Sequence, residues 1–424
     1  MRRWPPILSC MLMLGALVAT VLRTIRGPND WAEAHWLLDY RFGFVKRGLV
    51  GQVLTWTTGL LGIPVSEGLI GGVALAICVG FCGLLLLLAC RIAKDASWSP
   101  AVVAAMVAFL TSPFLVMTGH VVGYYDHIFL PLGVLSVWLA LRGKLWAGAV
   151  VQALALLIHE SCAVLIYPVF ALACLLHSTG RTEPAAKPPS LLPLLLPVVM
   201  AVVMAIVLAS PPAGFPQSYA DHLKTFPFVQ GGYDSITPSL LALSPGQAWA
   251  LATSKWPGLP SLAERMTQPS AYGLLLPTLI ALLVSFAQRA RLPASLESGA
   301  VAFVVLVPQA LHLIAWDFER IWTCSILMAF LVVWLYSEAR RLEHTEQVGV
   351  FTASLLAVAA NLLMETPLLD YAHDQMPRWV RVCVMLALLG ALLLLAGMQS
   401  ALPLRERLRW RGQSLADLWL RRPR

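Results

Sequence analysis

Long apolar runs alternate with short polar segments along almost the whole chain. A helix needs about 20 residues to cross a hydrocarbon core of about 30 Å, and many of the runs approach that length. Charged or Pro/Gly-rich segments separate twelve of them, at 5–22, 68–90, 99–118, 121–141, 145–160, 162–177, 191–210, 270–287, 299–315, 321–336, 348–364 and 380–398. The pattern predicts an all-α polytopic membrane protein with about 12 transmembrane helices, within a range of 10 to 13.

Composition agrees with this prediction and excludes other classes of protein. Of the 424 residues, 58% are hydrophobic and 12% are charged, and the mean hydropathy is +0.75. A soluble domain of average composition carries about 25% charged residues. A soluble core, a disordered chain and a disulfide-rich secreted scaffold are therefore excluded. The eight cysteines fall within the apolar runs and show no CxxC spacing, so we interpret them as packing residues.

The net charge of +8 is mainly an orientation signal. The segment that follows Leu22 offers no small-residue cleavage site, so we expect the first run to be a retained helix. With the N-terminus inside, 19 of the 30 Lys and Arg fall in cytoplasmic segments, as the positive-inside rule requires. Both termini are then cytoplasmic, and the basicity gives no reason to expect nucleic acid as a partner. Residues 1–403 form the predicted membrane domain, and 404–424 form a basic amphipathic tail on the inner leaflet.

Two long outer loops, 23–67 and 211–268, are expected to line or cover a site. In the first, Asp30 and Glu33 have the spacing of a capping box, which predicts a short helix beginning there. The second is rich in proline and aromatic residues, which is typical of an ordered lid.

Ionisable residues gather at four outward ends of the predicted spans. Such groups are costly at membrane depth and indicate function by default. The clusters are Asp39, Arg41, Lys46 and Arg47 after the first span; Tyr124, Asp126 and His127; His159 and Glu160; and Trp316, Asp317 and Arg320. The spans on either side of Glu160 are short, so the turn between them should lie below the outer surface. Asp317 and Arg320 are three residues apart and can pair on one helix face.

Each cluster also has a purely structural interpretation. The first could be an interfacial helix whose charges face water, the second a pair that stabilises a helix end, and the last two structural ion pairs. Their recurrence at four outward ends favours a shared polar cavity open to the outer leaflet.

Such a cavity suits a substrate with an apolar tail and a phosphate head. The planar fork of arginine donates two parallel hydrogen bonds to a phosphate, and a partly desolvated carboxylate can act as a general base. Sugar transfer from a polyprenyl-phosphate carrier requires both roles. No P-loop and no GxGxxG motif is present, and no nucleotide site is needed because the lipid phosphate is the leaving group.

The layout, together with the segments DYRFGFVKRGLVG (39–51), YYDH (124–127), LIHES (157–161) and WDFER (316–320), resembles the GT-C superfamily of integral-membrane glycosyltransferases and similar bacterial multi-spanning proteins. The resemblance implies a catalytic carboxylate in the first outer loop, at Asp39 with Asp30 as second choice. This loop lacks the adjacent acidic pair of the family pattern. The resemblance also implies a multi-pass protein of the bacterial inner membrane whose active site faces the periplasm.

The hypothesis assigns roles to these residues. Asp39 acts as general base, and Arg47 and Arg320 bind the phosphate with help from Lys46. The catalytic set is Asp39, Asp126 and Glu160; the substrate-binding set is Arg41, Lys46, Arg47, Tyr124, His127, His159, Trp316, Asp317 and Arg320. The partners are a polyprenyl-phosphate-linked sugar donor, a glycan, lipid or protein acceptor, and membrane lipids. No cofactor and no metal ligand set is indicated, although a divalent metal is compatible with the chemistry.

Three other functions remain open. A transporter or flippase for a lipid-linked or anionic solute would share the span number, but it would hold its polar groups near the midplane. An outer-leaflet polysaccharide polymerase or acyltransferase would use the same cavity. A structural membrane subunit would not explain the repeated ionisable residues at depth.

Overall fold

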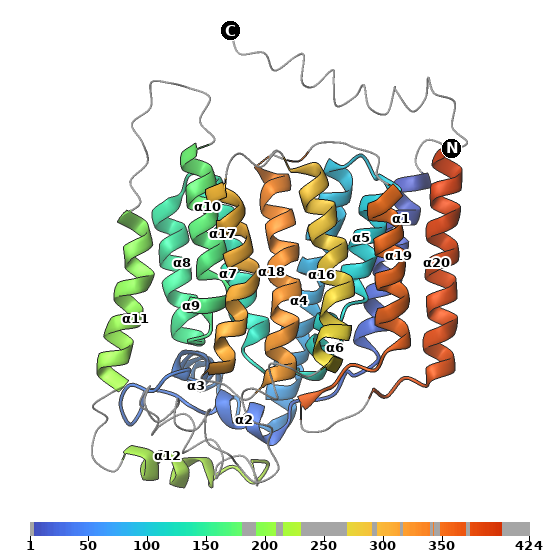
Figure 1. The fold of residues 1–424 in the computed structure, drawn as a ribbon. Coiled ribbons are helices and arrows are strands. Elements are labelled where there is room, and N and C mark those ends of the chain that lie inside the picture. The colour runs from blue at the N-terminus through green and yellow to red at the C-terminus, as the bar shows by residue number, and fades with distance from the viewer. Residues whose placement is uncertain are drawn as a thin grey trace.

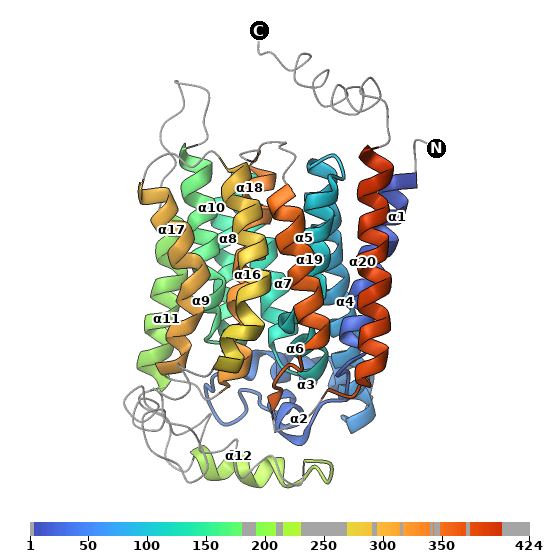
Figure 2. The ribbon, with the colours of Figure 1, turned by 45° about the vertical axis from the view of Figure 1, so that its right-hand side comes forward.

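The computed structural model describes residues 4–179, 192–208, 215–229, 269–290, 295–313, 317–339, 342, 348–369 and 374–400. Regular structure in these residues is helical, apart from an isolated bridge between Ala290 and Leu342. Long helices stand side by side in one bundle, while α2, α3 and α12 lie across one end of it (Figures 1 and 2). The prediction of an all-helical fold is confirmed in these ranges.

Four helical stretches are long and apolar enough to cross a membrane: Glu67–Asp95, Pro100–His120, Glu319–Glu338 and Arg378–Met398. Eight shorter apolar helices of 10–17 residues occupy the positions of the other predicted runs in the described part of the chain. The helices are α1 (Trp4–Val21), α2 (Asp30–Trp36), α3 (Gly48–Leu61), α4 (Glu67–Asp95), α5 (Pro100–Leu110), α6 (Pro113–His120), α7 (Asp126–Leu141), α8 (Leu145–Ile158), α9 (Cys162–Leu165), α10 (Tyr167–Thr179), α11 (Leu195–Leu208), α12 (Phe215–Leu223), α16 (Pro269–Arg289), α17 (Ser295–Leu306), α18 (Phe318–Glu338), α19 (Val348–Leu363) and α20 (Arg378–Ser400), with 3-10 turns η1 (Leu192–Leu194) and η3 (Val307–Leu313).

The core of the bundle is built on α5 and α18. Every residue of α5 from Ala101 to Leu110 is buried, and Phe109 of α5 stacks on Phe330 of α18 with ring centroids 3.8 Å apart. A helix that is apolar on all sides must be buried on all sides, whereas a helix at the edge exposes one apolar face. The edge helix α11 accordingly leaves Val199, Val202 and Ile206 exposed. This distribution suits a bundle whose outer faces contact lipid.

Local sequence explains where the helices break. α5 and α6 are separated just before Pro113, which has no backbone N–H to continue the hydrogen-bond ladder. α8 stops at Ile158 because His159 has an extended backbone, with φ −155° and ψ 126°. The predicted break at His159 and Glu160 is therefore confirmed.

Two expectations about helix ends were wrong, and one helix was not predicted. The fourth span does not begin at 121 but at Asp126, the first residue of α7, where a carboxylate interacts favourably with the helix dipole. The predicted short helix does begin at Asp30, as α2, but its cap is Asn29, whose side chain accepts the N–H of Ala32, rather than Asp30. Helix α3 was not predicted, because its glycines and short length hide it within the first outer loop.

A buried ion cluster joins the end of α1 to the connection between α19 and α20. The Arg23 guanidinium donates to Asp374 Oδ2 from Nε at 2.8 Å and to the backbone oxygen of Asn361 at 2.8 Å. Arg381 also reaches Asp374 at 3.4 Å and Glu365 at 3.1 Å. Both arginines and Asp374 are almost fully buried. Two buried cations thus share the carboxylate of Asp374, and hydropathy alone did not single them out.

The fold should therefore depend strongly on Asp374. Changing Asp374 to Asn leaves Arg23 and Arg381 buried without their shared negative charge, which costs about 3 kcal/mol. We expect the melting temperature of the detergent-purified protein, followed by intrinsic fluorescence, to fall by several degrees. The control is D221N, since the exposed Asp221–Lys224 pair should contribute less than about 1 kcal/mol. Equal melting temperatures for D374N and D221N would contradict this role.

Candidate functional site

The segment 23–67, predicted as the first outer loop, is folded tightly against one end of the bundle by a close approach at Gly51. A Cβ atom at Gly51 would lie 2.0 Å from the backbone oxygen of Leu38, so only glycine fits there. Gly48 is similarly confined by Tyr40 and Val45, each of which has a side-chain atom 2.7 Å from the point where a Cβ would lie. Directly before Gly48, Arg47 adopts a left-handed backbone with φ 66° as the N-cap of α3. Such strain persists only where the surroundings enforce it.

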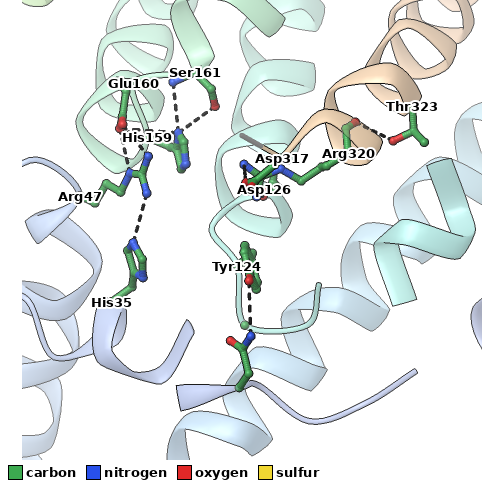
Figure 3. Close-up of polar contacts among 12 residues, drawn as sticks. His35, Arg47, Tyr124, Asp126, His159, Glu160, Ser161, Asp317, Arg320 and Thr323 are labelled. Carbon is green, nitrogen blue, oxygen red and sulfur yellow. Dashed lines mark hydrogen bonds and ion pairs between the residues drawn. The ribbon is translucent and has the colours of Figure 1, made fainter. Parts of the chain in front are cut away.

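This geometry directs Arg47 to Glu160 at the break between α8 and α9. Arg47 Nε donates to Glu160 Oε2 at 2.9 Å and Arg47 Nη2 donates to Oε1 at 2.5 Å, a two-pronged pair (Figure 3). Lys46 Nζ lies 3.7 Å from Glu160 Oε1. Burial lowers the pKa of Lys46; Glu160 opposes this effect and Arg47 adds to it. Two cations therefore surround one carboxylate.

His35 on α2 holds Arg47 from the other side. Its Nδ1 lies 2.7 Å from the Trp31 carbonyl and must carry the proton, so Nε2 accepts from Arg47 Nη1 at 3.1 Å. Burial and the Arg47 charge lower the pKa of His35 well below its ordinary value, which keeps it neutral. The Tyr125 hydroxyl donates to the His35 carbonyl at 2.6 Å. His35 was not among the predicted site residues, because nothing in its local pattern points to Arg47.

A second ion group lies on α7 and α18. Arg320 Nη1 lies 3.3 Å from Asp126 Oδ2, and Arg320 Nη2 lies 3.0 Å from Asp317 Oδ2, so the predicted Asp317–Arg320 pair is confirmed. The guanidinium also lies over the Tyr124 ring, 5.6 Å from its centroid. Here one cation serves two carboxylates, the reverse of the Arg47 group.

His159 lies between the two groups. Its Nδ1 lies 3.7 Å from Glu160 Oε2. The charges of Arg47, Asp126 and Arg320 are also close enough to influence its ring. Its Nδ1 accepts from the backbone N–H of Ser161 at 3.1 Å and lies 2.8 Å from the Ser161 hydroxyl. Figure 3 shows His159 between Arg47 and the Asp126–Arg320 pair. The structure thus brings together members of all four predicted clusters at one end of the bundle.

Asp39 belongs to a separate contact. Arg41 binds its carboxylate through Nε at 2.9 Å and Nη2 at 2.7 Å, and the Thr55 hydroxyl donates at 3.1 Å. Burial alone would raise the pKa of Asp39, but the hydrogen bonds from Arg41 hold it below its ordinary value. Nearby, the Tyr219 hydroxyl donates to the Asp39 carbonyl, and Arg41 Nη1 lies 3.3 Å from His222 Nδ1. These contacts fasten α12 to the first outer loop.

The remaining candidates differ in position. His127 is buried in α7 against the Phe81 ring, behind Asp126. Trp316 lies outside the described residues, as do most of the 211–268 lid and the 404–424 tail. Among the residues that the structure describes, no group of three or more His, Cys, Asp or Glu side chains is arranged to hold a metal ion.

Comparison of the chain with protein-family models, curated proteins and solved structures finds no match. The function of the site must therefore be inferred from the residues themselves.

The placement of Arg47 should depend on Gly51. In G51A the new methyl group collides with the Leu38 carbonyl, so α3 must move and Arg47 must leave Glu160. We expect a melting temperature several degrees lower in detergent, since overpacking costs about 1–3 kcal/mol. G59A is the matched control, because a Cβ at Gly59 meets nothing within 4 Å. An unchanged G51A protein would show that the close approach is not maintained.

Glu33, on the same helix as His35, should give the protein a pH-dependent stability. Burial, with the charges of Glu67 and Asp30, raises the pKa of Glu33 to about 7. The folded protein then retains a proton that the unfolded chain releases, so stability falls as the pH rises from about 5 to about 8. In E33Q, which has no titrating carboxyl at this position, the melting temperature should fall less than that of the wild type between about pH 5 and about pH 8. Parallel pH profiles for E33Q and the wild type would refute the assignment.

Proposed function

We propose that the protein is a membrane glycosyltransferase that moves a sugar from a polyprenyl-phosphate carrier to an acceptor at the outer leaflet. The observation that carries the proposal is that two ion groups lie on either side of His159 and have opposite excesses of charge. Arg47 and Lys46 outnumber Glu160 on one side, and Asp126 and Asp317 outnumber Arg320 on the other. The cationic half suits a phosphate, and the anionic half suits sugar hydroxyls.

Apolar surface beside the cationic half supports a lipid substrate. α8, which ends next to Glu160, exposes Trp146, Val150 and Leu154 at four-residue spacing, so they share one helix face. α3, which begins after Arg47, exposes Val53, Trp56 and Leu60. An apolar tail lying on these faces would bring its phosphate to Arg47.

The described helices support a transmembrane arrangement for this function. Together with the four long helices, the eight shorter apolar helices would give about 12 spans in a GT-C-like bundle. With both termini cytoplasmic, the end that carries α2, α3 and α12 faces the periplasm of a bacterial inner membrane. The site then lies at the depth of lipid headgroups.

The transfer step needs one base and one neutralising cation. An acceptor hydroxyl oxygen attacks the anomeric carbon, the bond from that carbon to the phosphate oxygen breaks, and the phosphate leaves with the electron pair. A carboxylate takes the hydroxyl proton, while the Arg47 guanidinium, with help from Lys46, neutralises charge on the departing phosphate. Glu160 and Asp317 are the best placed bases, since their side chains are 38% and 35% exposed. Asp39, held by Arg41, is better suited to fixing the loop.

A transporter or flippase is the second candidate, and the broken helix at α8 and α9 favours it. Transporters often build their binding sites on discontinuous helices. The polar groups of this break lie at the end of the bundle rather than at its middle, which favours the enzyme.

Replacing either guanidinium by an ammonium should disable transfer. R47K loses the two-pronged hydrogen bonds to phosphate, and R320K loses the fork that holds Asp126 and Asp317 against the sugar. Removing one such group costs about 100-fold in rate. The measurement is release of free polyprenyl phosphate from a polyprenyl-phosphate hexose or pentose by the protein reconstituted with bacterial lipids. R91K is the matched control. Arg91 lies near the C-terminal end of α4 and pairs with Glu338 at the C-terminal end of α18, whereas Arg320 lies at the N-terminal end of α18. Wild-type protein that moves the donor across the bilayer without releasing phosphate would establish the transporter instead.

A further inference from the structure

The Arg47–Glu160 pair has the geometry that an arginine–phosphate pair would have. A carboxylate and a phosphate both present two oxygens to the guanidinium fork, so the two groups compete for the same donors. In this structure the donors Nε and Nη2 of Arg47 are both taken by Glu160. An anionic headgroup can use this fork only after Glu160 has left it.

The two partners are not equally fixed. The Arg47 side chain is 13% exposed, whereas that of Glu160 is 38% exposed. Arg47 also keeps its hydrogen bond to His35, and its backbone is confined in the loop held by Gly51. Glu160 instead sits in a turn between α8 and α9, outside regular helix. The cation is therefore the stationary partner, and the carboxylate is the partner that can move.

The charge balance favours exchange. Lys46, 3.7 Å from Glu160, adds a second cation that one carboxylate cannot fully neutralise. The phosphate diester of the sugar donor presents two free oxygens and one negative charge, as the Glu160 carboxylate does, so it can replace Glu160 on the fork. The phosphate monoester that transfer releases carries up to two negative charges and satisfies Arg47 and Lys46 together. His35 accepts from Arg47 Nη1, a nitrogen that Glu160 does not use, so this hydrogen bond does not compete with the anion.

We infer that Glu160 is a displaceable internal ligand of the Arg47 fork, which keeps the anion site closed until a phosphate headgroup exchanges with it. This inference rests on the proposed function, because it concerns the regulation of that same site. Displacement also frees the Glu160 carboxylate at the moment when the phosphate arrives. The residue that blocks the empty site thereby becomes available as a base only in the loaded site.

The test is equilibrium binding of two probes to the purified full-length protein in detergent: inorganic phosphate and a short-chain prenyl monophosphate. E160Q keeps the size of the side chain but removes the competing charge, so it should bind both probes about 10-fold more tightly than the wild type. D221N, with its exposed carboxylate outside the site, should bind as the wild type does. R47A should bind neither probe. Tighter binding of the prenyl compound than of free phosphate would identify the lipid headgroup as the ligand, and equal binding would identify free phosphate.

A second measurement guards against misfolding. Without the Glu160 charge, Arg47 and Lys46 repel one another, so E160Q should melt at a lower temperature than the wild type. Addition of the prenyl monophosphate should restore the wild-type melting temperature. Binding by E160Q that equals or is weaker than wild-type binding, while R47A still loses it, would overturn displacement and leave the phosphate site standing. Wild-type binding by R47A would instead remove Arg47 from the phosphate site and with it the proposed function.

Discussion

The ion pair between Arg47 and Glu160 is the contact that holds together the end of the molecule with the candidate site. It joins residues 113 positions apart in the chain and fixes the first outer loop beneath the break between α8 and α9. Charges removed from water are stable only when paired with good geometry, so the loop and the break stabilise each other. The tight fold at Gly51 and the hydrogen bond from Arg47 to His35 serve that same pairing.

The sequence predicted the helices well and their contacts only in part. Hydropathy located the apolar helices because each is a continuous run, and ionisable residues at His159 and Glu160 located a break because they interrupt such a run. Asp317 and Arg320 were found as a pair because they are three residues apart on one helix. The Arg320–Asp126 contact spans 194 positions, and no local pattern encodes a tertiary contact of that kind.

Two further features show why local signals were insufficient. Helix α3 contains several glycines and leaves Trp56 and Leu60 exposed, so it has neither the length of a span nor the polar face of a soluble helix. Asp39 was selected by likeness to a family motif, yet the nearest guanidinium, that of Arg41, lies only two residues away and occupies it. A motif gives the residue type at a position. The role of that residue depends on which side chains contact it in the folded protein.

Helix α3 also supports the proposal that a lipid headgroup binds at Arg47. A helix with an exposed apolar face settles about 5–10 Å into the boundary between headgroups and acyl chains. α3 lies across the end of the bundle with Val53, Trp56 and Leu60 exposed, and it begins directly after Arg47 (Figure 1). In the proposed arrangement this apolar face would hold the Arg47 guanidinium at the level of lipid phosphates. A lipid phosphate would then reach Arg47 without leaving the leaflet, which is the reason for preferring it over a soluble anion in the proposal.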